Sequence, residues 1–95
     1  MYGTVAYLQA KPGVEAKLVE QFNQKVPGLV GACIYRMDAA SQTYYATVMF
    51  ESKAAYFANA NSPEQNRRYE AMRALLTSEP EWHDGEIVYE HMNEL

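Results

Sequence analysis

Residues 29–50 read LVGACIYRMDAASQTYYATVMF, and this stretch decides the fold class of the chain. Two runs rich in β-branched and aromatic side chains, residues 29–37 and 43–50, flank the polar segment DAASQ. Such side chains favour the extended backbone of strands, and a polar segment of this length suits a hairpin loop. The stretch therefore predicts two neighbouring antiparallel strands in the middle of the chain.

The same stretch predicts a sheet that is apolar on both faces. Successive side chains of a strand point to opposite faces, so residues 43–50 give two sets. One face carries Tyr44, Ala46, Val48 and Phe50, and the other carries Tyr45, Thr47 and Met49. One layer of helices covers only one face, and a large exposed apolar patch is unusual in a monomer. We therefore expect a symmetric homodimer in which a second copy covers the other face.

The segments before the hairpin predict a strand and an amphipathic helix. Residues 4–10 have the composition of a strand, and the KPG turn at residues 11–13 ends it. An apolar residue then recurs every four positions, which is the spacing of one helix face, at Val14, Leu18, Phe22 and Val26. The PG pair at residues 27–28 ends this helix.

Two helix starts and a last strand follow the hairpin. Ser52 can cap a short helix that runs through Ala60, and Ser62, Pro63 and Gln65 form a second N-terminal pattern with a capping box. The buried stripe of this second helix ends before Pro80, and residues 86–92 form the last strand. The order β-α-β-β-α-β predicts one α+β domain over residues 1–95, a ferredoxin-like four-stranded antiparallel sheet with its helices on one face.

Charge and cysteine content narrow the classes of partner and cofactor. A formal net charge of −4 repels phosphate backbones and anionic headgroups, so we expect neither nucleic acid nor membrane as a partner. Cys33 is the single cysteine, and His83 and His91 lack metal-motif spacing, so we expect no metal. With no apolar run of about 20 residues, the sequence predicts a cytoplasmic protein.

The segment EPEWHDGEIV, residues 79–88, holds the single tryptophan and one of the two histidines. Adjacent residues of an extended segment point to opposite sides, so His83 and Asp84 do not converge on one ion. Pro80 stops the preceding helix and Asp84 with Gly85 forms a turn signal, which makes Trp82 an anchor that holds a connector on the core. The alternative is that Trp82 and His83 line a pocket.

Two other groups of residues receive structural interpretations. Cys33 is interpreted as a small packed side chain, because no His or Lys is adjacent to activate it. Arg67, Arg68 and Arg73 form a solvated helix face, with Glu64 and Arg68 spaced for an ion pair. The alternative for these arginines is an anion site.

Four short motifs resemble the antibiotic-biosynthesis-monooxygenase family of dimeric α/β barrels, and the resemblance spans nearly the whole chain. They are KPG before the first helix, PG before the second strand, FESKAAY after the third strand and NSPEQ at a helix start. The resemblance implies a ferredoxin-like subunit, a dimer whose two sheets face each other, and a pocket between sheet and helices. Characterised relatives oxygenate polycyclic phenols or quinols without metal or flavin, degrade haem, or have no known activity.

The resemblance also implies positions for the site residues. Haem-degrading relatives have asparagine, tryptophan and histidine where this chain has Ala6, Asn59 and Tyr69, so we expect no haem turnover. Asn59 and Tyr69 are the candidate catalytic residues, since an amide can orient a phenol or an oxyanion and a tyrosine can exchange a proton. Their alternative roles are a helix cap and core packing. The candidate substrate-binding residues are Tyr7, Tyr45, Trp82 and His83.

Two functional hypotheses follow. The first is a cofactor-independent monooxygenase acting on an aromatic phenol or quinol, and the polar residues at the helix break favour it. The second is a non-catalytic homodimer that binds a small apolar ligand or serves as an interaction domain, and the missing histidines favour it.

Overall fold

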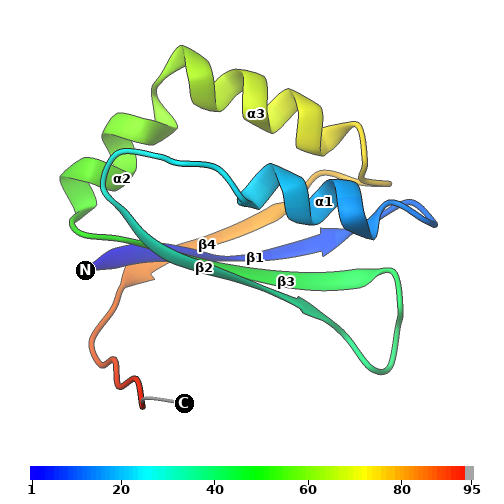
Figure 1. Ribbon diagram of the computed structural model, residues 1–95, viewed down its shortest axis with the longest axis horizontal. Coiled ribbons are helices and arrows are strands. Elements are labelled where there is room, and N and C mark those ends of the chain that lie inside the picture. Colours follow the sequence, from blue (N-terminus) through cyan, green and yellow to red (C-terminus); the bar gives the residue numbers. More distant parts are fainter. Residues whose placement is uncertain (94–95) are drawn as a thin grey trace.

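The computed structural model describes residues 1–93, which form a four-stranded antiparallel sheet with three helices on one face (Figure 1). The strands are β1 (Tyr2–Gln9), β2 (Leu29–Arg36), β3 (Thr43–Phe50) and β4 (Glu81–Glu86), in the order β2-β3-β1-β4. The helices are α1 (Glu15–Phe22), α2 (Lys53–Ala60) and α3 (Pro63–Arg73). This is the predicted ferredoxin-like arrangement with the second helix split in two. Within residues 1–93, no helix has the length and apolar character needed to cross a membrane.

The hydrophobic core lies between the sheet and the helices. Ala6 pairs with Ala46 and Leu8 with Tyr44 across β1 and β3, and all four side chains are buried. Leu18 of α1 and Met72 of α3 pack onto this layer, together with Leu76, Val14, Phe22, Ile34, Tyr69 and Leu75. The predicted alternation of β3 is present: one set faces the helices (Tyr44, Ala46, Val48 and Phe50), and the other set faces away from them.

Serine caps begin the two helices after β3, as the sequence predicted. Ser52 Oγ accepts a hydrogen bond from Ala55 N at 3.0 Å, and Ser62 Oγ accepts one from Gln65 N at 3.1 Å. Ser62 N donates to Asn59 O at 3.0 Å, so the side chain of Gln65 does not close a capping box and is available for other contacts.

The last strand lies at Glu81–Glu86, and the prediction of residues 86–92 was wrong. Asp84 pairs with Thr4 and Gly85 with Gly3, so the Asp84–Gly85 dipeptide continues the strand and makes no turn. β4 is an edge strand, which tolerates polar side chains, and its backbone pairs with β1 on one side only. Val88, Tyr89 and Met92, which follow it, are exposed, with Val88 at 91%.

The face of the sheet opposite the helices carries exposed apolar side chains. Tyr35 is 52% exposed, Val5 is 44% exposed and Tyr45 is 37% exposed, and all three point away from the helices. Cys33 is also exposed, because its neighbours on β2 alternate onto the helix side, so its interpretation as a packed residue was wrong. The chain after β4 leaves the sheet on this open side (Figure 1).

Candidate functional site

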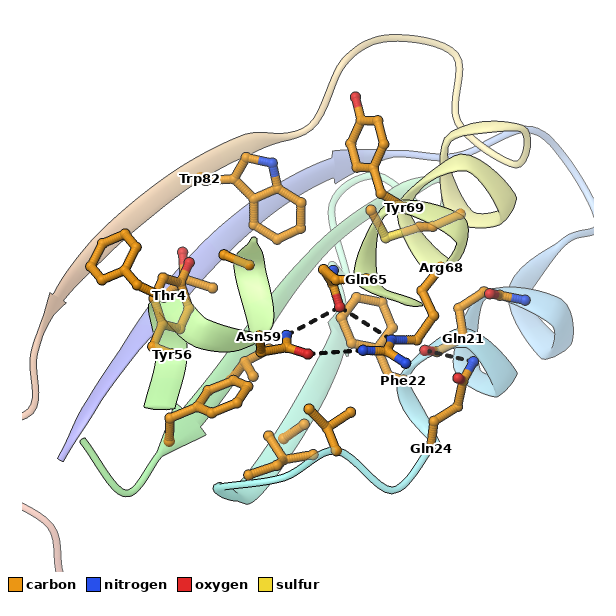
Figure 2. Close-up of a pocket in the computed structure, with 18 of the residues that line it drawn as sticks. Thr4, Gln21, Phe22, Gln24, Tyr56, Asn59, Gln65, Arg68, Tyr69 and Trp82 are labelled. Atoms are coloured by element: carbon orange, nitrogen blue, oxygen red, sulfur yellow. Dashed lines mark hydrogen bonds between the residues drawn. The ribbon is translucent and has the colours of Figure 1, made fainter. Parts of the chain in front are cut away.

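A cavity of about 380 Å³ lies between the helix-facing side of the sheet and helices α2 and α3. This volume is within the range of about 300–1,000 Å³ that is usual for small-molecule sites. Strand residues form its floor, α2 and α3 form one wall, and the end of α1 with the following loop forms another (Figure 2). The cavity is thus bounded by segments from the whole length of the chain.

Aromatic rings make up much of the cavity wall. The rings are those of Phe22, Phe50, Tyr56, Phe57, Tyr69 and Trp82. Phe50 and Tyr56 meet edge to face with centroids 5.4 Å apart, and Tyr56 and Phe57 do so at 5.1 Å. Aromatic walls held in edge-to-face contact suit a flat apolar ligand, because they offer large area at low cost in side-chain freedom.

A polar network of three side chains lies at the junction of α2 and α3 (Figure 2). Arg68 Nη2 donates to Asn59 Oδ1 at 2.8 Å, and Arg68 Nε donates to Gln65 Oε1 at 3.1 Å. Asn59 Nδ2 donates to the same Gln65 oxygen at 3.2 Å. The three contacts fix the orientation of the Asn59 amide, whose oxygen faces the guanidinium.

A second polar group lies at the β4 side of the cavity. Tyr56 OH donates to Asp84 Oδ1 at 2.7 Å, and both residues line the cavity. Burial raises the pKa of Tyr56 to about 12, and the hydrogen bond to the Asp84 carboxylate acts in the same direction. Thr4 is only 6% exposed, and its Oγ1 has no hydrogen-bond partner within residues 1–93. A buried hydroxyl facing the cavity without a partner can serve a ligand.

Tyr69 presents its ring to the cavity and its hydroxyl to the outside. The hydroxyl donates to Glu79 Oε2, and Arg73 Nε donates to Glu79 Oε1 at 3.0 Å. This hydrogen bond to Glu79 raises the pKa of Tyr69, and it lowers the pKa of Glu79 together with Arg73. In Figure 2 the phenol oxygen points away from the Asn59 network. The hydroxyl is therefore already engaged and is poorly suited to take a proton inside the cavity.

The structure divides the candidate residues of the sequence between two faces. Asn59, Tyr69 and Trp82 line the cavity, and Trp82 does so as a residue of β4 opposite Ala6 rather than as the anchor of a connector. Tyr7 and Tyr45 lie on the open face and meet edge to face, with centroids 5.3 Å apart. His83 also lies on the open face, opposite Val5, because β4 alternates.

Several cavity residues were not found by sequence reasoning. Arg68 was predicted to lie on the solvent face and to pair with Glu64. In the structure Arg68 lines the cavity, and Glu64 lies 3.9 Å from Arg67. Tyr56, Asp84 and Thr4 carried no motif. A correct position for β4 would have identified Asp84 and Thr4, because the pairing of β4 with β1 brings these two residues side by side. Within residues 1–93, no group of three or more His, Cys, Asp or Glu side chains is arranged to hold a metal ion.

Comparison with known proteins relates this architecture to a group of solved structures. No protein-family model and no curated protein matches the sequence. A candidate antibiotic biosynthesis monooxygenase from Chloroflexus aurantiacus J-10-fl superposes with a TM-score of 0.77 at 19% identity, covering 96% of each chain. One from Bordetella bronchiseptica gives 0.75 at 20% identity, covering 93% of this chain and 97% of that one. This chain has the antibiotic biosynthesis monooxygenase fold.

One protein with the same monooxygenase fold is described by its activity. SnoaB from Streptomyces nogalater, a cofactor-independent oxygenase whose structure was solved as an asparagine-to-alanine variant, superposes with a TM-score of 0.73. The identity is 19%, and the alignment covers 94% of both chains. At these identities the likeness establishes the fold, and the chemistry must be argued from the cavity itself.

Proposed function

We propose that this protein is a cofactor-independent monooxygenase that oxidises a small aromatic phenol or quinol bound between the sheet and the helices. The observation that carries the proposal is the aromatic cavity of about 380 Å³ with polar groups at two ends. Its fold is that of SnoaB, which is a cofactor-independent oxygenase. The likeness in fold raises the prior for oxygen chemistry, and the cavity supplies the means to bind a ring.

The reaction balances without an added reductant. A phenol that loses two hydrogens and gains one oxygen atom becomes a quinone, and the second oxygen atom of O2 leaves as water. Both electrons for this water come from the substrate, after its hydroxyl proton has been removed. The protein therefore needs to bind the ring, accept the proton and stabilise the oxyanion away from water.

The cavity offers one group for each of these tasks. Asp84 is the one carboxylate among the described residues that line it, and it accepts the phenolic proton in this proposal. The Asn59 amide, oriented by Arg68 and Gln65, lies at the opposite end of the cavity and donates to a second oxygen of the substrate, onto which the negative charge is delocalised. Tyr69 contributes its ring to the wall, because its hydroxyl is held by Glu79.

An oxygen-consumption screen over hydroquinones and polycyclic phenols tests the proposal. A phenol that the protein oxidises should be consumed more slowly by Asn59→Ala and by Asp84→Asn, by about a hundredfold if each removes one catalytic contact. Tyr7→Phe changes a tyrosine on the open face and should keep the rate of the unmodified protein. Oxygen uptake no faster than in buffer for every compound would leave the enzyme proposal without support.

A non-catalytic ligand-binding protein is the second candidate function. The lining contains no histidine among the described residues, and an engaged Tyr69 hydroxyl leaves few groups to move protons. This candidate predicts that aromatic compounds change the emission of Trp82, the single tryptophan, without consuming oxygen. The two measurements on the same compound separate the candidates.

We also propose that two copies pair through their open sheet faces, as the sequence analysis expected. Support comes from the exposure of Tyr35, Val5 and Tyr45, and from the exposed apolar tail after β4 on the same side. A second copy would remove this apolar surface from water. The proposed setting is the cytoplasm, where the single cysteine, Cys33, stays a thiol.

A further inference from the structure

The guanidinium of Arg68 is a cation at the cavity without an acidic partner. Within residues 1–93, ion pairs closer than 4.0 Å involve Arg36, Arg67, Arg73 and His83, and none involves Arg68. The side chain is partly buried, and both of its hydrogen-bond acceptors are neutral amide oxygens. A partly buried cation that meets only neutral groups keeps most of its attraction for an anion.

The surroundings of Arg68 favour an anion at this position. Its Nη1 makes no hydrogen bond to the described residues, so two donors remain free besides one on Nη2. An open groove lies on the outer side of Arg68, and Gln21, Gln24, Glu64, Arg67 and Ala71 line it together with Arg68. The carboxylate of that groove, Glu64, lies 3.9 Å from Arg67. Free donors and nearby amides form a site for a charged oxygen group.

The cavity is also charged in opposite senses at its two ends. Asp84 and Tyr56 lie at the β4 side, and Arg68 with Asn59 lies at the junction of α2 and α3. An anionic group would be repelled by Asp84 and attracted by Arg68, while the aromatic rings between them hold an apolar body. The charges therefore select one orientation of a ligand that has one anionic end.

We propose that the phenol or quinol of this cavity also carries a carboxylate group, which binds Arg68 while the ring lies against the aromatic wall. The proposal rests on the proposed function in that it assigns the ligand to the same cavity, but it requires no oxygen chemistry. Arg68 is then a specificity-determining residue that contacts the ligand, besides holding Asn59. An uncharged aromatic of the same shape binds more weakly, since it leaves the guanidinium donors unmatched.

The test compares phenylbutyrate with phenylbutyramide, which have nearly the same shape and differ in charge. Both are titrated into the full chain while the emission of Trp82 is recorded, because this tryptophan lines the cavity and is the single one in the chain. We expect the carboxylate to bind about tenfold more tightly than the amide, the size of one charge-assisted contact in a partly exposed site. Raising the salt concentration should reduce this preference.

Variants of Arg68 and of a lysine outside the cavity separate a contact from a general charge effect. Arg68→Gln should remove the preference for phenylbutyrate and leave the affinity for phenylbutyramide within about twofold. Arg68→Lys keeps the charge and should retain part of the preference. Lys17→Gln removes one positive charge from an exposed position of α1 that lines neither the cavity nor the groove, and it should keep the preference intact.

The possible results separate failure of this inference from failure of the proposed function. Equal affinities for acid and amide in the unmodified protein, or equal losses for both in Arg68→Gln, would overturn the anion site while the cavity still binds aromatics. If neither compound changes the emission of Trp82, the anion site and the binding role of the cavity both fall. Oxygen uptake plays no part in these titrations, so its absence would bear on catalysis alone.

Discussion

Replacing Gly28 with alanine should destabilise the protein by displacing α2, the helix that carries Asn59 into the cavity. Gly28 has φ +81°, a backbone conformation that side chains other than glycine rarely adopt. A Cβ atom added there would lie 2.7 Å from Cβ of Ala55 in α2. The carbonyl of Gly28 also accepts from Glu51 N at 2.9 Å, which ties the turn to the end of β3. The turn cannot move away freely, so α2 must shift.

The expected loss has two parts. A left-handed conformation costs an alanine about 1–2 kcal/mol, and overpacking against a helix costs about 1–3 kcal/mol more. Their sum is about 2–5 kcal/mol for Gly28→Ala. Gly13→Ala is the matched control, because Gly13 has φ +74° and nothing lies within 4 Å of its added Cβ. It should lose only the first part, about 1–2 kcal/mol.

Urea unfolding of both variants and the parent, at one protein concentration, measures the two losses by linear extrapolation. Gly28→Ala should also weaken the binding of phenylbutyrate in the absence of urea, because α2 carries Tyr56, Phe57 and Asn59. Equal losses for the two variants would show that Ala55 does not resist the added methyl group. Unchanged binding in a destabilised Gly28→Ala would refute the link between this turn and the cavity.

Two further predictions concern the open face and the titration of Tyr56. Met49→Lys places a charge on the open face and should convert the proposed dimer to monomers, as measured by light scattering. Val19→Lys places the same charge on the exposed surface of α1 and should leave the dimer intact. A Met49→Lys protein that remains dimeric would count against pairing through this face. Because the pKa of Tyr56 is raised in the folded protein, this phenol loses its proton at lower pH in the unfolded chain than in the folded one. The contribution of Tyr56 to the free energy of unfolding is therefore complete below pH 10.0 and is lost as pH rises toward about 12. Tyr56→Phe should therefore flatten the alkaline fall in unfolding free energy, and a curve parallel to that of the parent would contradict the assignment.

The fold was predictable where local pattern and tertiary packing agree. The hairpin of β2 and β3 and the serine caps of α2 and α3 each have a strong local signal, and the structure contains all of them. The position of β4 was predicted wrongly because its sequence, EWHDGE, is polar and contains a dipeptide typical of turns. Its strand conformation comes from pairing with β1, a contact between the two ends of the chain that no local pattern reports.

The cavity was less predictable than the fold. Asn59, Tyr69 and Trp82 were identified as site residues and line the cavity. Tyr7, Tyr45 and His83 lie on the other face, because each is one residue out of phase with the helix-facing residues of its strand. The spacing of Glu64 and Arg68 in the sequence predicted that the two residues form an ion pair on the solvent face. The position of Arg68 depends on the angle between α2 and α3 at the helix break, and the periodicity within one helix does not report that angle.

The break between α2 and α3 explains why Arg68 can meet Asn59 at all. On one continuous helix of about 3.6 residues per turn, residues nine positions apart point to opposite sides, about 180° from each other. Here Asn61 ends α2 and Ser62 with Pro63 starts α3 in a new direction, so the last turn of α2 faces the second turn of α3. Ser62 Oγ also donates to Asn59 O at 2.8 Å, which fixes the backbone at the corner. The NSPEQ motif thus builds the polar end of the cavity. It ends one helix, begins the next, and supplies Gln65, whose side chain bonds to both Asn59 and Arg68. Straightening this corner would separate the guanidinium from the amide, and with them the anion site and the oriented Asn59.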